Sequence, residues 1–141
     1  MSNFSDPLSA YAAVFKDLTA DSLPRLAALL TDDVFFRDPF HALTGRDSVV
    51  ALFKAMYRRM PEARFEVLDV CAHPGGETHY LRWRFTGGRF DFTGVSTVRF
   101  NAAGLVSEHI DYWDAAGGVY ERLPVLGGLL RGFRRLAFGA Q

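Results

Sequence analysis

Two short stretches of the sequence place carboxylates next to imidazoles, which are the side chains that general acid–base chemistry uses. The first is VFFRDPFH, in which Asp38 and His41 stand among phenylalanines. The second is HIDYWD, in which His109, Asp111 and Trp113 alternate along the chain. A carboxylate among aromatic side chains loses hydration and becomes a stronger base. Asp38 and Asp111 are therefore the predicted catalytic residues.

Each of these residues also has a purely structural interpretation. Asp38 can simply hold the turn into Pro39, as aspartates before loops often do. His41 either orients the Asp38 carboxylate or faces solvent. Asp111 can be an ordinary polar residue at the edge of a sheet. The four histidines of the sequence show no metal-ligand spacing, so neither a metal site nor a cofactor is expected.

Helix signals come first along the chain. Asp6 and Pro7 stand in the order of a cap followed by a first helical residue, and apolar residues follow at helical spacing. Two further helices are predicted at 21–30 and 46–60. Between them, 32–38 is a predicted strand, which ends where the proline after Asp38 prevents further pairing. This order places Asp38 at the end of a strand.

Strand signals fill the second half of the chain. Apolar residues recur at every second position, and glycine-containing turns separate segments that should form an antiparallel meander: 64–73, 78–86, 89–101 and 105–113. Four apolar residues are expected on the sheet face that the helices cover: Phe90, Phe92, Val98 and Phe100. Their expected neighbours in the helices are Phe15, Leu26 and Phe53. Cys71 is expected in the core. Three helices followed by a curved sheet predict an α+β domain.

The composition excludes several classes of protein. The 141 residues include 16 basic and 16 acidic side chains, so the sequence lacks the positive charge of a nucleic-acid-binding protein. One cysteine allows no intrachain disulfide, and the first residues show no signal sequence, which indicates a cytoplasmic protein. No stretch is apolar for long enough to cross a membrane. The length suits a single domain over 1–141, with 115–138 as a helical extension.

The order of these elements, with the motifs LLTDDVFFRDP and FNAAGLVSEHIDYWDAAGG, resembles the nuclear transport factor two-like superfamily. That superfamily includes ketosteroid isomerase, limonene epoxide hydrolase and the polyketide cyclases. The resemblance implies a cone-shaped α+β roll, in which a curved antiparallel sheet wraps around the N-terminal helices and encloses an apolar pocket. It also implies a homodimer joined through the sheet, which would bury Val106, Ile110 and Tyr112 on the face opposite Asp111.

The resemblance assigns the strand-end aspartate of a ketosteroid isomerase to Asp38, where it would act as the general base. Such an isomerase also needs hydrogen-bond donors for the enolate oxygen. The positions of those donors correspond to Val14, Phe53 and Ser96 in this sequence. The oxyanion hole of an isomerase is therefore not expected in its usual form.

The resemblance to limonene epoxide hydrolase concerns Asp111, which corresponds to a last-strand aspartate that positions water. The middle strand offers Arg82 without the neighbouring acid of that family. The expected function is cofactor-independent acid–base catalysis, of isomerase, cyclase or hydrolase type, on a small apolar or carbonyl-containing molecule. The alternative is a non-catalytic module that binds a hydrophobic ligand or dimerises. The residues expected to bind the substrate are His41, His109, Trp113, Phe53, Ser96 and Arg82.

A C-terminal segment continues beyond the predicted sheet. Pro124 should begin a helix, with leucines and Phe133 on one stripe and three arginines largely elsewhere. Three roles are open for this helix: a lid over the cavity or the sheet, a dimer element, or a weak contact with a membrane surface.

Overall fold

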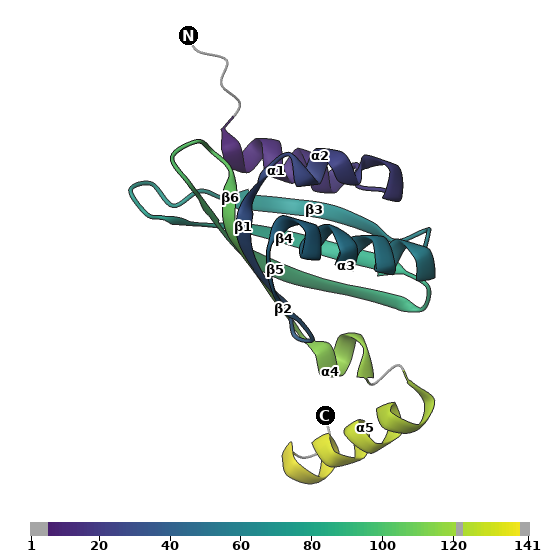
Figure 1. The fold of residues 1–141 in the computed structure, drawn as a ribbon. Helices are drawn as coiled ribbons and strands as arrows, with labels where there is room; N and C mark the ends of the chain where they lie inside the picture. The colour runs from purple at the N-terminus through teal and green to yellow at the C-terminus, as the bar shows by residue number, and fades with distance from the viewer. Residues whose placement is uncertain (1–5, 121–122, 139–141) are drawn as a thin grey trace.

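The computed structural model describes residues 6–120 and 123–138, and it packs helices against one face of a curved sheet (Figure 1). The helical elements before the sheet meander are α1 (Pro7–Lys16), the 3-10 turn η1 (Ala20–Ser22), α2 (Leu23–Ala27) and α3 (Arg46–Arg59). Pro7 and Pro24 both lie in first helical turns, as predicted. The fold class, an α+β roll with helices wrapped by a curved sheet, is confirmed.

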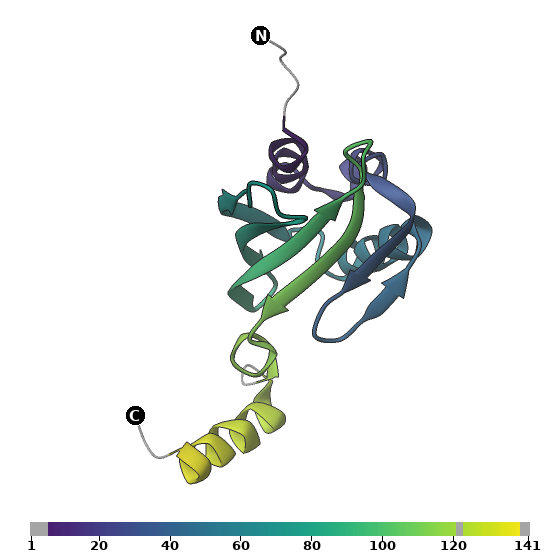
Figure 2. The same cartoon turned by 90° about the vertical axis from the view of Figure 1, so that its left-hand side faces the viewer.

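The sheet has six strands in the order β2-β1-β6-β5-β4-β3. The strands are β1 (Leu30–Arg37), β2 (Ala42–Thr44), β3 (Arg64–Cys71), β4 (Thr78–Gly87), β5 (Phe90–Phe100) and β6 (Val106–Trp113). The last four form the predicted antiparallel meander. The first strand lies beside β6 and pairs with it in parallel, which sequence periodicity does not indicate (Figure 2).

The second helix is shorter than predicted, because its expected last residue belongs to a strand. Leu30 begins β1, where it is fully buried and pairs with Val106. The short strand β2 was not predicted at all. Its pairing with β1 turns the chain back immediately after the aromatic stretch around Asp38.

The core lies between the helices and the concave face of the sheet. Leu81, Trp83 and Phe85 of β4 are buried, whereas the intervening residues are exposed, as their alternation predicted. The four apolar residues expected on this face of β5 all pack into or against the core. Cys71 was expected there and is instead exposed at the end of β3. Val106 was expected on the outer face, but an irregularity in the β5–β6 pairing turns it into the core.

The C-terminal segment forms α4 (Ala115–Gly118) and α5 (Pro124–Phe138). Pro124 begins α5, as predicted. The helix projects away from the sheet and the other helices, so the expectation that it covers the cavity or the sheet is wrong (Figures 1 and 2). In the described part of the chain, no helix combines the length and hydropathy needed to cross a membrane. The outer face of β6 exposes Tyr112, and the homodimer through this face stays a prediction.

Gly94 in β5 provides the space that Trp83 occupies. A Cβ atom at Gly94 would lie 2.6 Å from the Trp83 ring and 3.1 Å from the Cβ of Trp113. We expect Gly94→Ala to lower the free energy of unfolding by about 1–3 kcal/mol, because it overpacks this part of the core. Urea unfolding followed by tryptophan fluorescence measures the change. Gly128→Ala is the control, since its Cβ would have no neighbour within 4 Å; equal losses in both variants would contradict this account.

Candidate functional site

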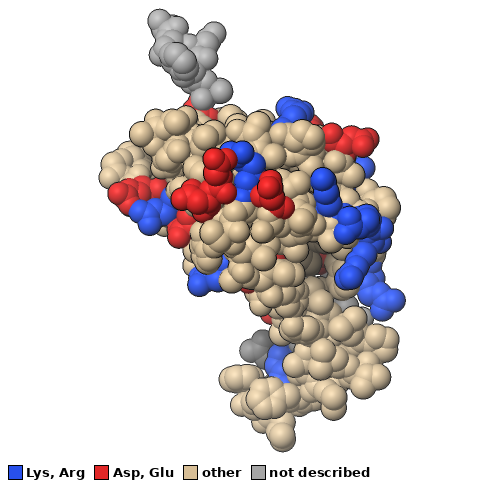
Figure 3. Space-filling view, in the orientation of Figure 1, with Lys and Arg blue, Asp and Glu red and all other residues tan. Residues whose placement is uncertain are grey.

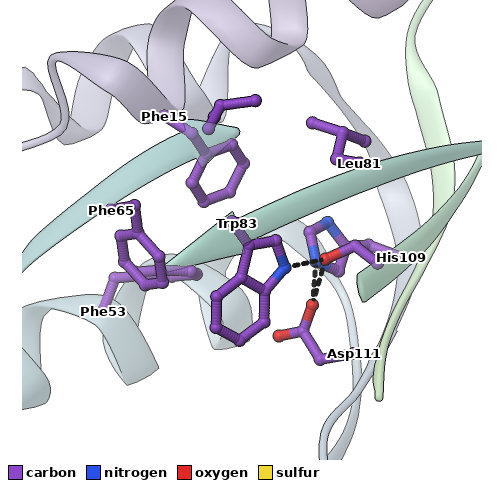
Figure 4. A pocket seen from close by; sticks show the side chains of 9 residues that line it. Phe15, Phe53, Phe65, Leu81, Trp83, His109 and Asp111 are labelled. Carbon is purple, nitrogen blue, oxygen red and sulfur yellow. Dashed lines mark hydrogen bonds and ion pairs between the residues drawn. The ribbon is translucent and has the colours of Figure 1, made fainter. Parts of the chain in front are cut away.

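A small cavity lies between the concave face of the sheet and helices α1 and α3 (Figure 4). Its walls are apolar apart from three side chains on β5 and β6. The lining residues are Phe15, Phe53, Phe65, Val67, Leu81, Trp83, Ser96, His109 and Asp111. The cavity volume is about 20 Å³, which is close to the space that one water molecule occupies. A larger ligand would therefore have to move some of the aromatic side chains.

A chain of hydrogen bonds runs along one side of this cavity. The Tyr11 hydroxyl lies 2.7 Å from Nδ1 of His109, and Nε2 of His109 lies 2.6 Å from Oδ1 of Asp111. The same carboxylate oxygen lies 2.5 Å from Oγ of Ser96, which in turn lies 2.8 Å from Nε1 of Trp83. Five side chains from α1, β4, β5 and β6 are thus joined in one chain, in which His109 and Ser96 both contact the same oxygen of Asp111.

The chemistry of these groups sets the direction of the bonds to Asp111. An ionised carboxylate only accepts hydrogen bonds, so His109 donates from Nε2, and in the neutral imidazole Nδ1 accepts from the Tyr11 hydroxyl. The indole of Trp83 only donates, so Ser96 receives that bond and donates its own proton to Asp111. Burial, and secondarily the negative charge of Asp111, raises the pKa of Tyr11 well above its ordinary value. Tyr11 therefore remains a donor across the physiological pH range.

Asp111 is held at one oxygen and open at the other. Its Oδ1 accepts from both His109 and Ser96, whereas no described residue donates a hydrogen bond to Oδ2 (Figure 4). The side chain is only 16% exposed, and aromatic residues form the nearby walls. The geometry presents a fixed carboxylate, with one unoccupied acceptor oxygen, to whatever enters the cavity.

Sequence patterns identified only part of this site. Asp111, His109, Ser96 and Phe53 were predicted site residues, and the fold brings all four to the cavity. Tyr11 was not predicted as a site residue, because it is one of the residues at helical spacing that form the apolar side of the first helix. The available signal was its hydroxyl, because a tyrosine on a buried helix face requires a hydrogen-bond partner.

Asp38 and His41 lie outside this cavity and are engaged with each other. Asp38 accepts hydrogen bonds from the backbone N–H groups of Phe40 and His41, at 2.8 and 2.7 Å. Nδ1 of His41 lies 3.0 Å from the same carboxylate oxygen. Neither residue is among those that line the cavity with Asp111. The geometry of Asp38 is that of an aspartate that holds its own turn.

Trp113 and Arg82 also lie away from the cavity walls. Trp113 stacks on Phe92, with ring centroids 4.4 Å apart, and meets the edge of Phe40. Arg82 extends from the exposed face of β4 and forms an ion pair with Asp69 of β3 at 2.6 Å. The hydrogen bond from Arg82 lowers the pKa of Asp69. An acid beside Arg82 therefore exists, but it comes from the neighbouring strand and faces outward.

The structure offers little for a metal ion. Within residues 6–120 and 123–138, no group of three or more histidine, cysteine, aspartate or glutamate side chains gathers at metal-binding distance. A second, open hollow lies near the β3–β4 turn, where Glu77 and Arg99 form an ion pair. Its lining is largely polar, so the cavity at Asp111 is the better candidate for a site that binds an apolar molecule.

Comparison with known proteins adds a family and a set of similar folds. Residues 10–109 match the family model described as a SnoaL-like domain. A search of the curated proteins finds no match. Solved structures of similar fold include an NTF2-like protein of unknown function from Exiguobacterium sp. 255-15, with a TM-score of 0.66 and 19% identity over 77% of this chain and 98% of that chain.

Two further structures carry the name of an activity. An LEH-like epoxide hydrolase from M. tuberculosis is 18% identical over 96% of this chain and 97% of its own, with a TM-score of 0.66. A candidate ketosteroid isomerase from Kribbella flavida DSM 17836 is 24% identical over 88% of this chain and 87% of its own, with a TM-score of 0.61. At these identities the similarity shows the fold alone.

Removal of the Tyr11 hydroxyl tests the hydrogen-bond chain. In Tyr11→Phe the buried Nδ1 of His109 loses its donor, and we expect the free energy of unfolding to fall by about 1–3 kcal/mol. Urea unfolding measures the loss, and nitrogen-detected NMR of His109 reports the change of tautomer or proton position. Tyr112→Phe is the matched control, because Tyr112 is half exposed on the outer face. An equal effect of the two substitutions would contradict the assigned role.

The buried tyrosines also predict how stability depends on alkaline pH. Burial raises the pKa of Tyr57 from 10.0 to about 12, and the pKa of Tyr11 is raised as well. Because the pKa is raised in the folded state, the contribution of each protonated tyrosine to the free energy of unfolding is complete below pH 10. That contribution is lost as the pH rises toward the pKa of the folded state. We therefore expect the free energy of unfolding to fall between pH 10 and about 12. The slope should be shallower in Tyr57→Phe, and an unchanged slope would contradict the assignment.

Proposed function

This chain belongs to the SnoaL-like family, and we propose that it is a cofactor-independent acid–base enzyme that acts on a small apolar or carbonyl-containing molecule. Family membership confirms the resemblance that the sequence motifs indicated. The observation that carries the proposal is the Asp111 carboxylate, which is fixed through one oxygen and presents the other to an aromatic cavity.

Asp111 is the general base in this proposal. Its free Oδ2 accepts a proton, either from carbon beside a carbonyl group or from a water molecule that attacks the substrate. The hydrogen bonds from His109 and Ser96 to Oδ1 keep the carboxylate oriented before and after the transfer. A base held in one orientation needs little rearrangement during the reaction, which lowers the barrier. Tyr11 and Trp83 are positioning residues, since they act only through His109 and Ser96.

The cavity walls support an apolar substrate. Phe15, Phe53 and Phe65 line the same cavity as the carboxylate, and their ring centroids lie 5.6 to 6.2 Å apart (Figure 4). Of the lining residues, Phe65 and Val67 on the edge strand β3 are only half-buried. A substrate that enters along this edge would displace these side chains and would keep the carboxylate away from bulk water. Exclusion of water strengthens the base toward the substrate.

Asp38 is not assigned the catalytic role, although the sequence motif first pointed to it. Its carboxylate accepts three hydrogen bonds within its own turn, and it lies outside the cavity at Asp111. Oδ2 of Asp38 also lies 3.1 Å from Nδ1 of His41, so both of its oxygens have a partner, and such a carboxylate is a poor acceptor for a substrate proton. This difference between the two aspartates gives the experiment a control within the same chain.

Substitution of the two aspartates separates catalysis from binding. Asp111→Asn keeps the shape of the side chain and removes its proton-accepting charge, so turnover should fall by about 10²–10⁴-fold. Asp38→Asn should retain most of the activity. A panel of unsaturated ketones and small epoxides, assayed for isomerisation and hydrolysis, provides the measurement.

Ligand binding decides between the enzyme and the alternative, a non-catalytic module for hydrophobic molecules. For an enzyme, Asp111→Asn should change the affinity for an unreactive apolar ketone only modestly while turnover collapses. If wild type and Asp111→Asn bind such ligands equally and neither converts any member of the panel, the binding module replaces the enzyme. If Asp38→Asn alone abolishes turnover, the base has been assigned to the wrong aspartate.

A further inference from the structure

We propose that helix α5 binds the surface of an anionic lipid bilayer and lies in the plane of the interface. The inference concerns a part of the chain that does not line the cavity, and it is independent of the reaction proposed above. It rests on three observations: the exposure of the helix, the arrangement of its apolar side chains, and the segregation of its charge.

The first observation is exposure. The large apolar side chains of α5 face solvent to an unusual degree, with exposed fractions of 77% for Val125, 67% for Leu129, 65% for Phe133 and 88% for Leu136. The helix projects beyond the sheet, and its visible surface in the space-filling view is almost without charge (Figure 3). An apolar surface of this extent on a water-soluble protein marks an interaction site.

The second observation is the arrangement of these side chains around the helix axis. At 3.6 residues per turn, Val125, Leu129, Phe133 and Leu136 fall on one side of the helix. Arg131, Arg134 and Arg135 fall on the other side, together with two glycines and, at the end of the helix, the exposed Phe138. A bulky apolar face opposite an arginine face is the arrangement of helices that lie in a membrane interface, where the arginine head groups reach the phosphates.

The third observation is charge. Helix α5 contains three arginines and no acidic residue. Because the whole sequence has a net charge of zero, the rest of the chain carries a net charge of −3. An anionic surface would therefore attract α5 and repel the remainder of the protein. Net charge alone does not separate a lipid surface from a second copy of the chain, because both carry negative charge. The broad apolar face opposite the arginines favours the lipid surface, which offers phosphates and acyl chains side by side.

The length of α5 fits a helix that lies on the membrane. Its 15 residues are too few to span the hydrocarbon core. Gly128 and Gly132 weaken the isolated helix, and a Cβ at either position would have no neighbour within 4 Å. Burial of the apolar face in the interface would supply the stabilisation that contacts with the rest of the domain do not.

Vesicle co-sedimentation of the full-length protein tests the proposal. Vesicles of phosphatidylglycerol and phosphatidylcholine in equal parts should bind the protein, and pure phosphatidylcholine vesicles should bind it much less. Added salt should weaken the binding to anionic vesicles, because it screens the arginines. Equal binding to the two kinds of vesicle would overturn the electrostatic part of the proposal.

Three variants assign the binding to α5. Leu129→Glu combined with Phe133→Glu should abolish binding, because both charges would enter the apolar face. Arg135→Gln should weaken binding to anionic vesicles by about fivefold and leave binding to neutral vesicles unchanged. Leu68→Glu is the control, since it places the same charge on an exposed leucine of β3.

Two outcomes would overturn the proposal. Binding of wild type and of the Leu129→Glu, Phe133→Glu variant to anionic vesicles with equal affinity would place the contact elsewhere. Absence of vesicle binding, together with a dimer in sedimentation that the same double substitution dissociates, would show that α5 docks against a second copy instead. Gly132→Ala should strengthen vesicle binding if the helix orders on the membrane.

Discussion

The buried imidazole of His109 needs a hydrogen-bond partner at each ring nitrogen, and this requirement connects the first helix to the last strand. Only 4% of His109 is exposed, so bulk solvent does not supply these hydrogen bonds. Tyr11 of α1 supplies one partner and Asp111 of β6 supplies the other. Helix α1 must therefore pack on the sheet beside His109, and in this position it forms one wall of the cavity. The position of the carboxylate follows from the same contact.

The core and the candidate site are made of the same side chains. Phe15, Phe53 and Trp83 are buried residues of the hydrophobic cluster, and they are also the walls in front of Asp111. Close packing of these rings stabilises the fold but leaves a cavity of only about 20 Å³. Function on a larger molecule thus requires that part of the core rearranges, whereas the polar chain behind it stays fixed by short hydrogen bonds.

The two ends of the molecule follow different physical rules. In the domain, apolar side chains are buried between two layers, and most charged residues lie on exposed strand and helix faces, where pairs such as Arg82–Asp69 and Arg84–Asp91 face water. In α5 the apolar face has no covering layer, and the charge is of one sign. The short helix α4, capped by Asp114, links these two regions. Helix α4 itself contacts β5.

The sequence by itself determined α1, α3, α5, the antiparallel meander and the fold class, because apolar periodicity, proline positions and glycine turns are local signals. It also indicated Asp111, His109, Ser96 and Phe53, since alternation along a strand assigns residues to one face. Only the tertiary structure decided the parallel pairing of β1 with β6 and the contact of Tyr11 with His109. Both join segments that are far apart in the chain, and no local pattern records such a pairing. The same holds for Asp38, whose motif indicated a base, but whose turn geometry and distance from the cavity lining arise only when the chain is folded.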